Sequence, residues 1–479
     1  MKKIFILFSI ALLAAACKKD IQTLNQETKR PTEVTPGSLF ANAQKKLVDE
    51  LTSSSVNQNI FRLLAQYWTE TTYTDESNYD LGTRNIPQNF WDTLFTRSVK
   101  NFAEAARLIP LQDKTYVSAK TVQNEAAMTE IMSVYSFYVL VSVYGDIPYS
   151  KALDINNVTP VYDDDAAIYT NLLGRLDAAL GKLDATGDSF DASDLLFGGD
   201  ISKWIIFANS LKMKMGMQLF DADATRAKAA VEAASPRAMM SNEDNASFSY
   251  QGAPPNTNPI WVDLVQSGRK DFVAANTLVD VMNTYDDPRL KFYFTGDSTT
   301  TATIYNGGLY GSSNNYATYS KPGAKLLKQD FEALLIDYAE IEFIRAEAVE
   351  RGMSVGGTAA LHYNNAVAAS IEYWGGTPTE AASYLGQSTV AYATATGTYK
   401  QKIGTQKWIA LYNRGFDAWT EWRRLDYPQL VAPVDALTAI PLRYPYPVQE
   451  QNLNTKNYNN AATAIGGDLV TTRLFWDKF

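Results

Sequence analysis

Aromatic residues recur through one polar segment of the chain, QYWTETTYTDESNYDLGTRNIPQNFW, at residues 66–91. Threonine, aspartate, asparagine, glycine and proline fill the intervals, which indicates a loop rather than a buried element. Ring faces can stack on a ligand while short polar side chains form hydrogen bonds with it, and exposed apolar groups commonly mark interaction sites. The segment therefore predicts a recognition surface. Its candidate ligand contacts are Trp68, Tyr73, Asp75, Asn78, Tyr79 and Arg84.

Other segments offer rings in a similar polar setting. The candidates are Tyr305, Tyr310 and Tyr316 in the Gly- and Asn-rich segment 305–323, Trp261 in the Pro-rich segment 249–264, and Trp374 at the end of a helical pattern. The alternative for all of these rings is burial against helices or contact with a protein partner. Trp91, which begins a helical pattern, is expected to pack.

Catalytic and metal sites are restricted by the composition. The chain has one histidine and one cysteine, so neither a multi-histidine metal site nor a cysteine-paired zinc site can form. His362 is the one candidate base for a Ser-His-Asp triad, but it lies in a helical pattern, where we expect a half-buried or surface residue. No feature places two carboxylates at the separation of about 5–9 Å that glycoside hydrolysis requires. We therefore expect no catalytic residue, no metal and no cofactor.

One acidic pattern resembles a calcium-binding loop. Asp221, Asp223, Thr225 and Glu232 occupy EF-hand positions one, three, five and twelve. Position six holds Arg226, where the loop requires glycine for its turn. Helix-forming alanines fill the other positions, so the segment predicts a helix rather than a calcium site.

The first residues have the pattern of an export signal. Two lysines precede an uncharged apolar run at 4–16, which is too short to span a bilayer but suits a signal peptide. Cys17 has no partner for an internal disulfide, and its position resembles the lipidated cysteine of a bacterial lipobox. We expect a lipoprotein signal peptide at 1–16 and a lipidated tether at 17–35. The alternative is an ordinary signal peptide with an incidental cysteine.

Charge and composition limit the remaining classes of protein to which the chain could belong. The formal net charge is −9, and an acidic chain without a basic cluster argues against nucleic acid as a partner. Hydrophobic residues make up 46% of the chain, which is ordinary for a globular protein. By length, residues 36–479 could form one large interlocked α-rich unit or two lobes. We expect a single domain that reaches the membrane only through the lipid anchor.

Helical periodicity dominates that domain. The predicted helical segments are 37–65, 92–108, 116–143, 164–184, 201–220, 224–235, 272–285, 331–352, 359–374 and 404–425. The segments 331–352 and 359–374, each closed by glycine, resemble one tetratricopeptide unit. The loops at 66–91, 249–264 and 305–323 are long, and long loops in compact proteins are usually functional or disordered. A Pro- and Asn-rich tail covers 436–479.

The last predicted helical segment carries a core stripe. Trp408, Tyr412, Trp419 and Trp422 recur there at helical spacing, which predicts burial. Arg423 and Arg424 follow, and we expect both to pair with carboxylates. The chain as a whole predicts an all-α protein with little β structure.

Several segments in order along the chain resemble the SusD/RagB family of Bacteroidetes outer-membrane lipoproteins, in its SusD-like branch. They are LNQETKRPTEVTPGSLFANAQ at 24–44, VYGDIPYSKAL at 143–153 with PVYDDDAAIY at 160–169, DYAEIEFIRAEAVERG at 337–352, QKWIALYNRGFDAWTEWRRLDYPQL at 406–430 and IPLRYPYPVQEQNLN at 440–454. The resemblance implies an all-α, SusD-like fold with four tetratricopeptide-like helix pairs packed against long loops.

The resemblance also implies a function. Members capture oligosaccharides at the outer membrane, on the cell exterior, and hand them to a SusC-like TonB-dependent barrel. A pyranose has apolar C–H faces and polar edges, so the rings of 66–91 would stack on the faces while their polar neighbours bond the edges. The alternatives are a peptide-binding importer subunit, a surface glycoside hydrolase, and a lid without a ligand pocket.

Overall fold

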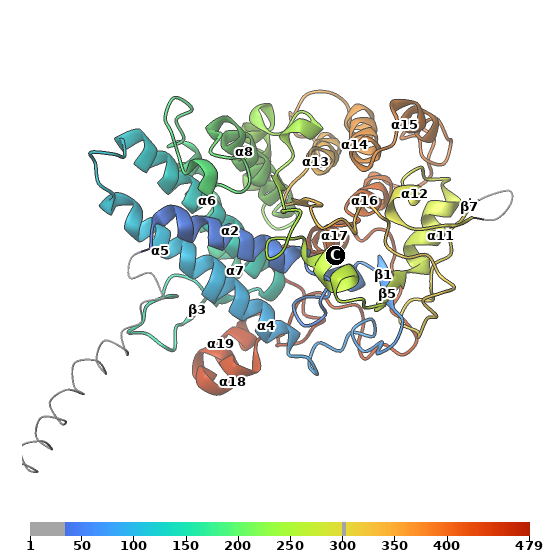
Figure 1. The fold of residues 1–479 in the computed structure, drawn as a ribbon, viewed down its shortest axis with the longest axis horizontal. Coiled ribbons are helices and arrows are strands. Elements are labelled where there is room, and N and C mark those ends of the chain that lie inside the picture. The colour runs from blue at the N-terminus through green and yellow to red at the C-terminus, as the bar shows by residue number, and fades with distance from the viewer. Residues whose placement is uncertain (1–33, 299–302) are drawn as a thin grey trace, which may run out of the picture.

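The computed structural model describes residues 34–298 and 303–479. The predicted signal peptide, Cys17 and nearly all of the predicted tether lie outside the described residues. Within them, the chain is mainly helical (Figure 1). The strands are few and short, as the sequence predicts.

The elements follow in order along the chain. The helices are α2 (Pro36–Thr52), α3 (Phe61–Leu64), α4 (Ile86–Thr93), α5 (Lys100–Leu108), α6 (Ala119–Tyr144), α7 (Asp165–Leu180), α8 (Ile201–Gln218), α9 (Ala224–Ala234), α10 (Pro259–Trp261), α11 (Asn276–Thr284), α12 (Leu290–Tyr293), α13 (Tyr338–Glu350), α14 (Ala359–Trp374), α15 (Pro378–Leu385), α16 (Tyr399–Ala410), α17 (Gly415–Leu425), α18 (Val448–Leu453) and α19 (Thr455–Ala464). Two π-helical turns, η1 (Leu94–Val99) and η6 (Val262–Gln266), continue α4 and α10. Short antiparallel pairs join β1 (Trp68–Glu70) to β5 (Phe272–Ala274), β2 (Ile147–Pro148) to β3 (Tyr162–Asp163), β4 (Ser247–Phe248) to β8 (Ala333–Leu334), and β6 (Asp297–Ser298) to β7 (Thr303–Ile304).

Helices that are neighbours in sequence pack as pairs. These pairs are α6 with α7, α8 with α9, α13 with α14, and α16 with α17, which agrees with the expected tetratricopeptide-like arrangement. Figure 1 shows α2, α4 and α5 beside α6 and α7 in one half of the molecule. The other half holds α13 to α16 next to α11 and α12.

The long helix α6 is apolar around most of its circumference because it is the central helix of the core. Ser118 caps its first turn by accepting a hydrogen bond from Thr121 N at 3.1 Å, and Gly145 ends it at φ 85°. Its length and hydropathy would suit a membrane span, yet 83% of its apolar window is buried inside the fold. Burial against other helices therefore accounts for its composition.

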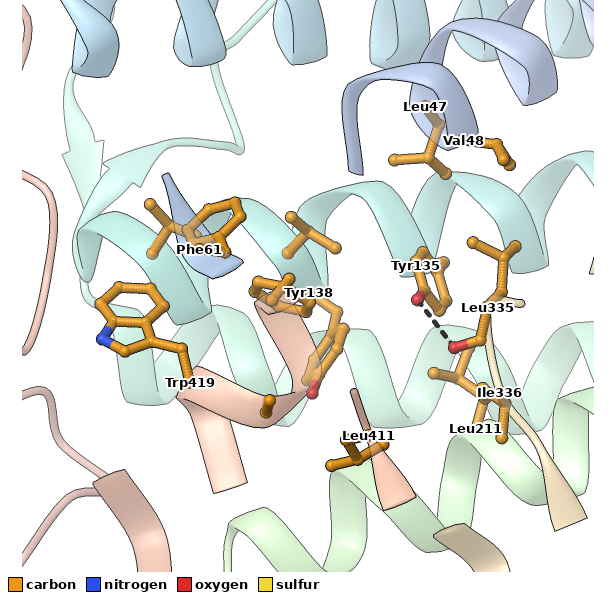
Figure 2. Packing of buried hydrophobic residues seen from close by; sticks show 14 of the residues in the cluster. Leu47, Val48, Phe61, Tyr135, Tyr138, Leu211, Leu335, Ile336, Leu411 and Trp419 are labelled. Carbon is orange, nitrogen blue, oxygen red and sulfur yellow. Dashed lines mark hydrogen bonds between the residues drawn. The ribbon is translucent and has the colours of Figure 1, made fainter. Parts of the chain in front are cut away.

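The main core joins segments that are far apart in sequence (Figure 2). Leu47 of α2 and Leu211 of α8 lie on different sides of α6, and Phe61 of α3 packs on Trp419 of α17 with ring centres 5.3 Å apart. Tyr135 of α6 donates a hydrogen bond from its hydroxyl to the carbonyl of Leu335 at 3.3 Å. A smaller cluster under α14 to α16 includes Phe343, Tyr363 and Tyr384.

Two predicted helices are shorter than expected for a visible reason: one ends early and the other begins late. The segment 37–65 breaks after α2, because the Ser53 and Ser54 hydroxyls both donate to Asp263 Oδ2 at 3.1 Å and hold the backbone in a turn. The helix predicted from residue 331 begins only at α13. There Asp337 accepts a hydrogen bond from Glu340 N at 2.7 Å as the N-cap, after β8 has paired with β4.

Three other segments also differ from the prediction. Residues 272–274 form β5 rather than the start of a helix, because they pair with β1. The segment 404–425 divides into α16 and α17. The Pro- and Asn-rich tail is ordered, and it contains α18 and α19 and ends near the fully buried Trp476.

The aromatic stripe of α16 and α17 is confirmed as core for three of its four rings. Trp408, Tyr412 and Trp419 are buried, and Trp422 is half-buried. Arg424 contacts Glu421 at 2.6 Å as predicted. Arg423 has no such carboxylate among the described residues. It donates to the carbonyl of Leu442 at 2.7 Å, its guanidinium lies 3.5 Å from the Trp419 ring centre, and burial lowers its pKa to about 9.

Buried charges connect three of the helix pairs. Lys214 of α8 lies between Glu340 of α13, at 2.7 Å, and Asp417 of α17. Arg414 also reaches both carboxylates, at 2.5 Å and 2.7 Å. Burial alone would raise the pKa of Glu340, but Arg414 and Lys214 lower it to about 2. The stability from this ionised carboxylate is present above its usual pKa of 4.5 and is lost as the pH falls towards 2.

Replacing one cation of this cluster is expected to be costly. Lys214→Met leaves Glu340 and Asp417 buried with fewer counter-charges, so the free energy of unfolding should fall by about 3–5 kcal/mol. Urea denaturation at pH 7 measures the change. The exposed control Lys114→Met should change it by no more than about 0.5 kcal/mol, and a similarly small effect of Lys214→Met would contradict a structural role for the cluster.

Candidate functional site

The segment 66–91 begins below the protein surface. Trp68 lies in β1, opposite Ala274 of β5, and its side chain is 1% exposed. Its Nε1 donates to the Tyr412 hydroxyl at 2.9 Å, and the Arg62 guanidinium lies 5.3 Å from its ring centre. The structure therefore corrects the expectation of an exposed ring at Trp68, since strand pairing turns this side chain into the core.

The turn after β1 carries the exposed part of the segment. Tyr73 is 78% exposed and adopts φ 54°, a left-handed conformation that is uncommon for a tyrosine. Asp75 is also exposed, whereas Asn78 and Tyr79 are buried. The Asn78 amide donates to the carbonyls of Thr74, at 2.9 Å, and Gly311, at 2.7 Å. Asn78 and Tyr79 therefore support the turn, and Tyr73 and Asp75 remain available to a ligand.

The segment 305–323 is bound to this turn by hydrogen bonds. Asn314 N and the Ser313 hydroxyl both donate to the carbonyl of Thr71, at 3.0 Å and 2.8 Å. Tyr310 is buried, and its hydroxyl donates to the carbonyl of Leu63 at 2.7 Å. Tyr310 therefore anchors the loop rather than presenting its ring.

Tyr316 is half-buried on the same loop and is flanked by cations. The ammonium groups of Lys270 and Lys321 lie 5.6 Å and 5.5 Å from its ring centre. The Lys270 backbone is joined to the turn, because the Thr71 hydroxyl donates to its carbonyl at 2.7 Å. The arrangement offers a partly exposed ring beside hydrogen-bond donors, which can contact a polar ligand with an apolar face.

A fourth segment, 429–437, completes this region, and no sequence pattern predicted a role for it. Gln66 Nε2 donates to the carbonyl of Val431 at 2.8 Å, and Leu437 N donates to the carbonyl of Asn78 at 3.0 Å. A groove of about 340 Å³ lies between this segment and residues 309–312. We call the four segments 71–79, 269–271, 309–321 and 429–437 the loop surface.

The loop surface rests on a pair of buried carboxyl groups. Glu70 is 4% exposed and accepts a hydrogen bond from Ser77 N at 2.8 Å. Burial, followed by the hydrogen bond and charge of Glu76, raises the pKa of Glu70 to about 9. Glu76 is paired with Arg84, which is half-exposed. Arg84 thus holds the base of the turn in this structure.

The remaining candidates lie elsewhere. Trp374 is 3% exposed and packs on Tyr293, with ring centres 4.7 Å apart, so it belongs to the core. Tyr305 is half-buried beside α11, where its carbonyl accepts a hydrogen bond from Asn283 at 3.1 Å. Trp261 is half-buried at the end of α10. The structure does not bring Trp261 and Trp374 into the loop surface.

His362 is part of the fold and is more buried than the sequence suggests. It is 8% exposed, and its ring contacts Glu342 Oε2 at 2.9 Å and the Gly356 carbonyl at 3.0 Å. Burial would lower the pKa of His362, but these two hydrogen bonds raise it above its usual value. Through the contact with Glu342, His362 links α14 to α13.

Acidic groups that could suggest a metal have helix-capping roles here. Asp146 and Asp164 accept from backbone nitrogens of α7 at 2.9 Å and 2.8 Å, and with Asp165 they form a close group of three carboxylates. Burial raises the pKa of Asp165 to about 7. The EF-hand-like segment is the helix α9, capped by Asp223, so the expected helix is confirmed.

Comparisons with known proteins agree with the fold. A SusD-like family model described as "Starch-binding associating with outer membrane" matches residues 28–447. The fold is similar to a chitin-binding SusD homolog from Flavobacterium johnsoniae, with 25% identity and a TM-score of 0.77 over 92% of this chain and 97% of that chain. A SusD homolog from Bacteroides uniformis gives 25% identity and a TM-score of 0.78 over 92% and 99%.

A further solved structure, a chitin-binding protein, is 25% identical with a TM-score of 0.80, and covers 93% of this chain and 100% of its own. No match was found among curated proteins. The family model spans most of the chain, and the helix pairs and short strands follow the same fold. The chain therefore belongs to the SusD-like family.

Proposed function

We propose that this protein captures glycans on its loop surface. The observation that carries the proposal is the placement of Tyr73, 78% exposed, on a turn bonded to the loop of Tyr316, with its flanking lysines. Pyranose rings have apolar faces that suit such rings and hydroxyl edges that suit the neighbouring polar groups. The family description and the chitin-binding relatives support a β- or α-linked glucose-type polymer as the ligand.

The proposed location and partner follow from the family and the N-terminal sequence. Cys17 is the proposed lipidation site, which would anchor residues 36–479 as a single domain in the outer membrane, facing the cell exterior. A SusC-like TonB-dependent barrel is the proposed recipient of the captured glycan. More than one acyl chain is needed for stable anchoring, which a lipobox cysteine supplies.

A binding role is favoured over catalysis. Glu70 and Glu76 form a close acidic pair in the segment that carries Tyr73, but they are 4% and 1% exposed and interact with each other. Glycoside hydrolysis needs two carboxyl groups that flank a bound sugar at about 5–9 Å. The pair under the loop surface is placed to hold a turn instead. Peptide capture is the remaining alternative ligand class.

Removal of either exposed ring should weaken glycan binding. We expect Tyr73→Ala and Tyr316→Ala each to reduce affinity by about tenfold, which corresponds to about 1.4 kcal/mol of lost contact. Native gels containing starch or a soluble chitin derivative measure this as lost retardation, and an assay for new reducing ends in the same mixtures tests for hydrolysis.

Tyr116→Ala is the matched control, because Tyr116 is 85% exposed but lies on a different loop, before α6. Retardation that survives both loop-surface substitutions would reject this site. New reducing ends would show an enzyme, and retardation by peptides alone would replace glycans as the ligand class.

The contribution of Glu70, beneath the turn that carries Tyr73, should make the free energy of unfolding depend on pH. The pKa of Glu70 is raised from 4.5 to about 9, so the stability it contributes is complete below pH 4.5 and is lost as the pH rises towards 9. Glu70→Gln keeps a hydrogen-bonding group for Glu76 and removes the titration. We expect the free energy of unfolding of the wild type to decline more steeply between pH 5 and pH 9 than that of Glu70→Gln, by up to about 1.4 kcal/mol per pH unit.

Urea denaturation at several pH values measures both slopes. Glu372→Gln, which removes an exposed carboxyl group, is the control and should follow the wild type. Parallel curves for Glu70→Gln and the wild type would show that Glu70 is ionised in the folded protein.

A further inference from the structure

A large cleft lies away from the loop surface. Its volume is about 800 Å³, which is within the range of small-molecule sites. Three elements form its walls: the last turns of α2, the continuous helix made by α4 and η1, and the segment 255–263. The two regions share no lining residue among the described residues.

The walls present polar side chains at helical spacing. The facing residues on α2 are Lys45, Lys46, Asp49 and Glu50, followed by the C-cap Ser53. Those on α4 and η1 are Asn89, Asp92, Thr93, Thr96 and Arg97. Both π-helical turns of the described chain, η1 and η6, contribute to the lining. Such turns are rare and occur frequently at functional sites, so their coincidence at one cleft favours a site over a packing gap.

Two carboxylates in the cleft, Asp263 and Asp49, are held in place by hydrogen bonds from neighbouring side chains. Asp263 Oδ2 accepts from Ser54 N and from both the Ser53 and Ser54 hydroxyls, each at 3.1 Å. Asp49 is fixed by Lys45 at 2.6 Å and by the Tyr250 hydroxyl at 3.0 Å. Carboxylates fixed in this way lose little conformational entropy when a ligand donates to them.

Two buried groups face the same space. Thr257 is 3% exposed, and its hydroxyl has no hydrogen-bond partner among the described residues. Such an orphan group normally has a partner that is a protein atom, a water or a ligand. Glu50 is 4% exposed, and burial raises its pKa to about 8 against the opposing effects of Thr93 and Arg97. At neutral pH its carboxyl group is therefore protonated and can donate.

The chemistry of the lining selects a class of ligand. Lys45, Lys46 and Arg97 balance Asp49, Asp92 and Asp263 when Glu50 carries its proton, so the lining has no net charge to attract an ion. No aromatic ring is among the lining residues that the structure describes. Hydroxyl groups, which both donate and accept, match this mixture of fixed acceptors and free donors.

We propose that this cleft is a second ligand site, which binds an uncharged, hydroxyl-rich molecule of oligosaccharide size through hydrogen bonds rather than ring stacking. The loop surface would hold a glycan by its faces, and the cleft would hold a sugar by its edges. Two sites on one chain raise the overall affinity for a polymer that can reach both. The proposal does not depend on the loop surface binding sugar.

Two tryptophans allow the sites to be observed separately. Trp261 lies between Pro259 and Val262, which line the cleft, and Trp68 lies beneath the loop surface. We would label the purified protein with 5-fluorotryptophan, assign both fluorine signals with Trp261→Phe and Trp68→Phe, and titrate maltotriose, tri-N-acetylchitotriose and glycylglycine. We expect at least one trisaccharide to shift the Trp261 signal saturably.

Matched substitutions then assign the shift. The isosteric pair Thr93→Val and Thr257→Val should weaken the Trp261 response by about tenfold together, and should leave any Trp68 response unchanged. Tyr316→Ala should weaken any Trp68 response and leave the Trp261 response unchanged. Thr225→Val, an exposed helical threonine of α9, is the control. A Trp68 response without a Trp261 response would overturn the second site alone, whereas a Trp261 response without a Trp68 response would overturn the loop-surface proposal alone.

The protonation of Glu50 gives an independent check. The groups around it that carry charge are Lys46 and Asp49 on α2, and Arg97 on η1. As the pH rises through 8, ionised Glu50 loses its donor, so the Trp261 response should weaken, and Glu50→Gln should keep it to higher pH. A response to glycylglycine only, or one that is insensitive to the threonine pair, would reject a hydroxyl-rich ligand in this cleft.

Discussion

The requirement that a buried charge be paired organises this fold. Lys214, 1% exposed along its side chain, lies where α8, α13 and α17 meet and reaches Glu340 and Asp417. An uncompensated charge there would be strongly destabilising. Helix pairs of this kind can slide on apolar contacts, which are not directional, whereas an ammonium between two carboxylates has few acceptable positions. The charges thus fix how the pairs are placed, and the aromatic core packs around that arrangement.

Periodicity predicted the helices well because most of them bury one apolar face. The predictions failed where a polar contact from a distant segment overrode the local pattern. Asp263 ends α2 through Ser53 and Ser54, and the pairing of β8 with the distant strand β4 delays the start of α13. Neither contact is visible in local sequence, because the partners are brought together only by the complete fold.

The candidate site shows the same limit in another form. Composition identified the segments 66–91 and 305–323, and the structure joins them through Thr71 and Asn314. Composition could not distinguish rings that are buried beneath the loops from rings that remain exposed. Trp68 is buried because its strand pairs with β5, and Tyr73 is exposed on a turn with a left-handed backbone conformation, and neither property is visible in composition. The segment 429–437 was missed because its role depends on backbone carbonyls, which every residue type provides.

Backbone-directed anchoring has a consequence for how this surface can change over generations. Gln66, Asn78, Ser313 and Asn314 hold the loops by bonding carbonyl groups, so the residues at the tips are not needed to keep the loops in place. Substitutions at positions such as Tyr73 or Tyr316 can therefore alter what is recognised at little cost to folding. If the loop surface captures glycans as proposed, recognition of new polymers could therefore arise here without a change in the helical scaffold.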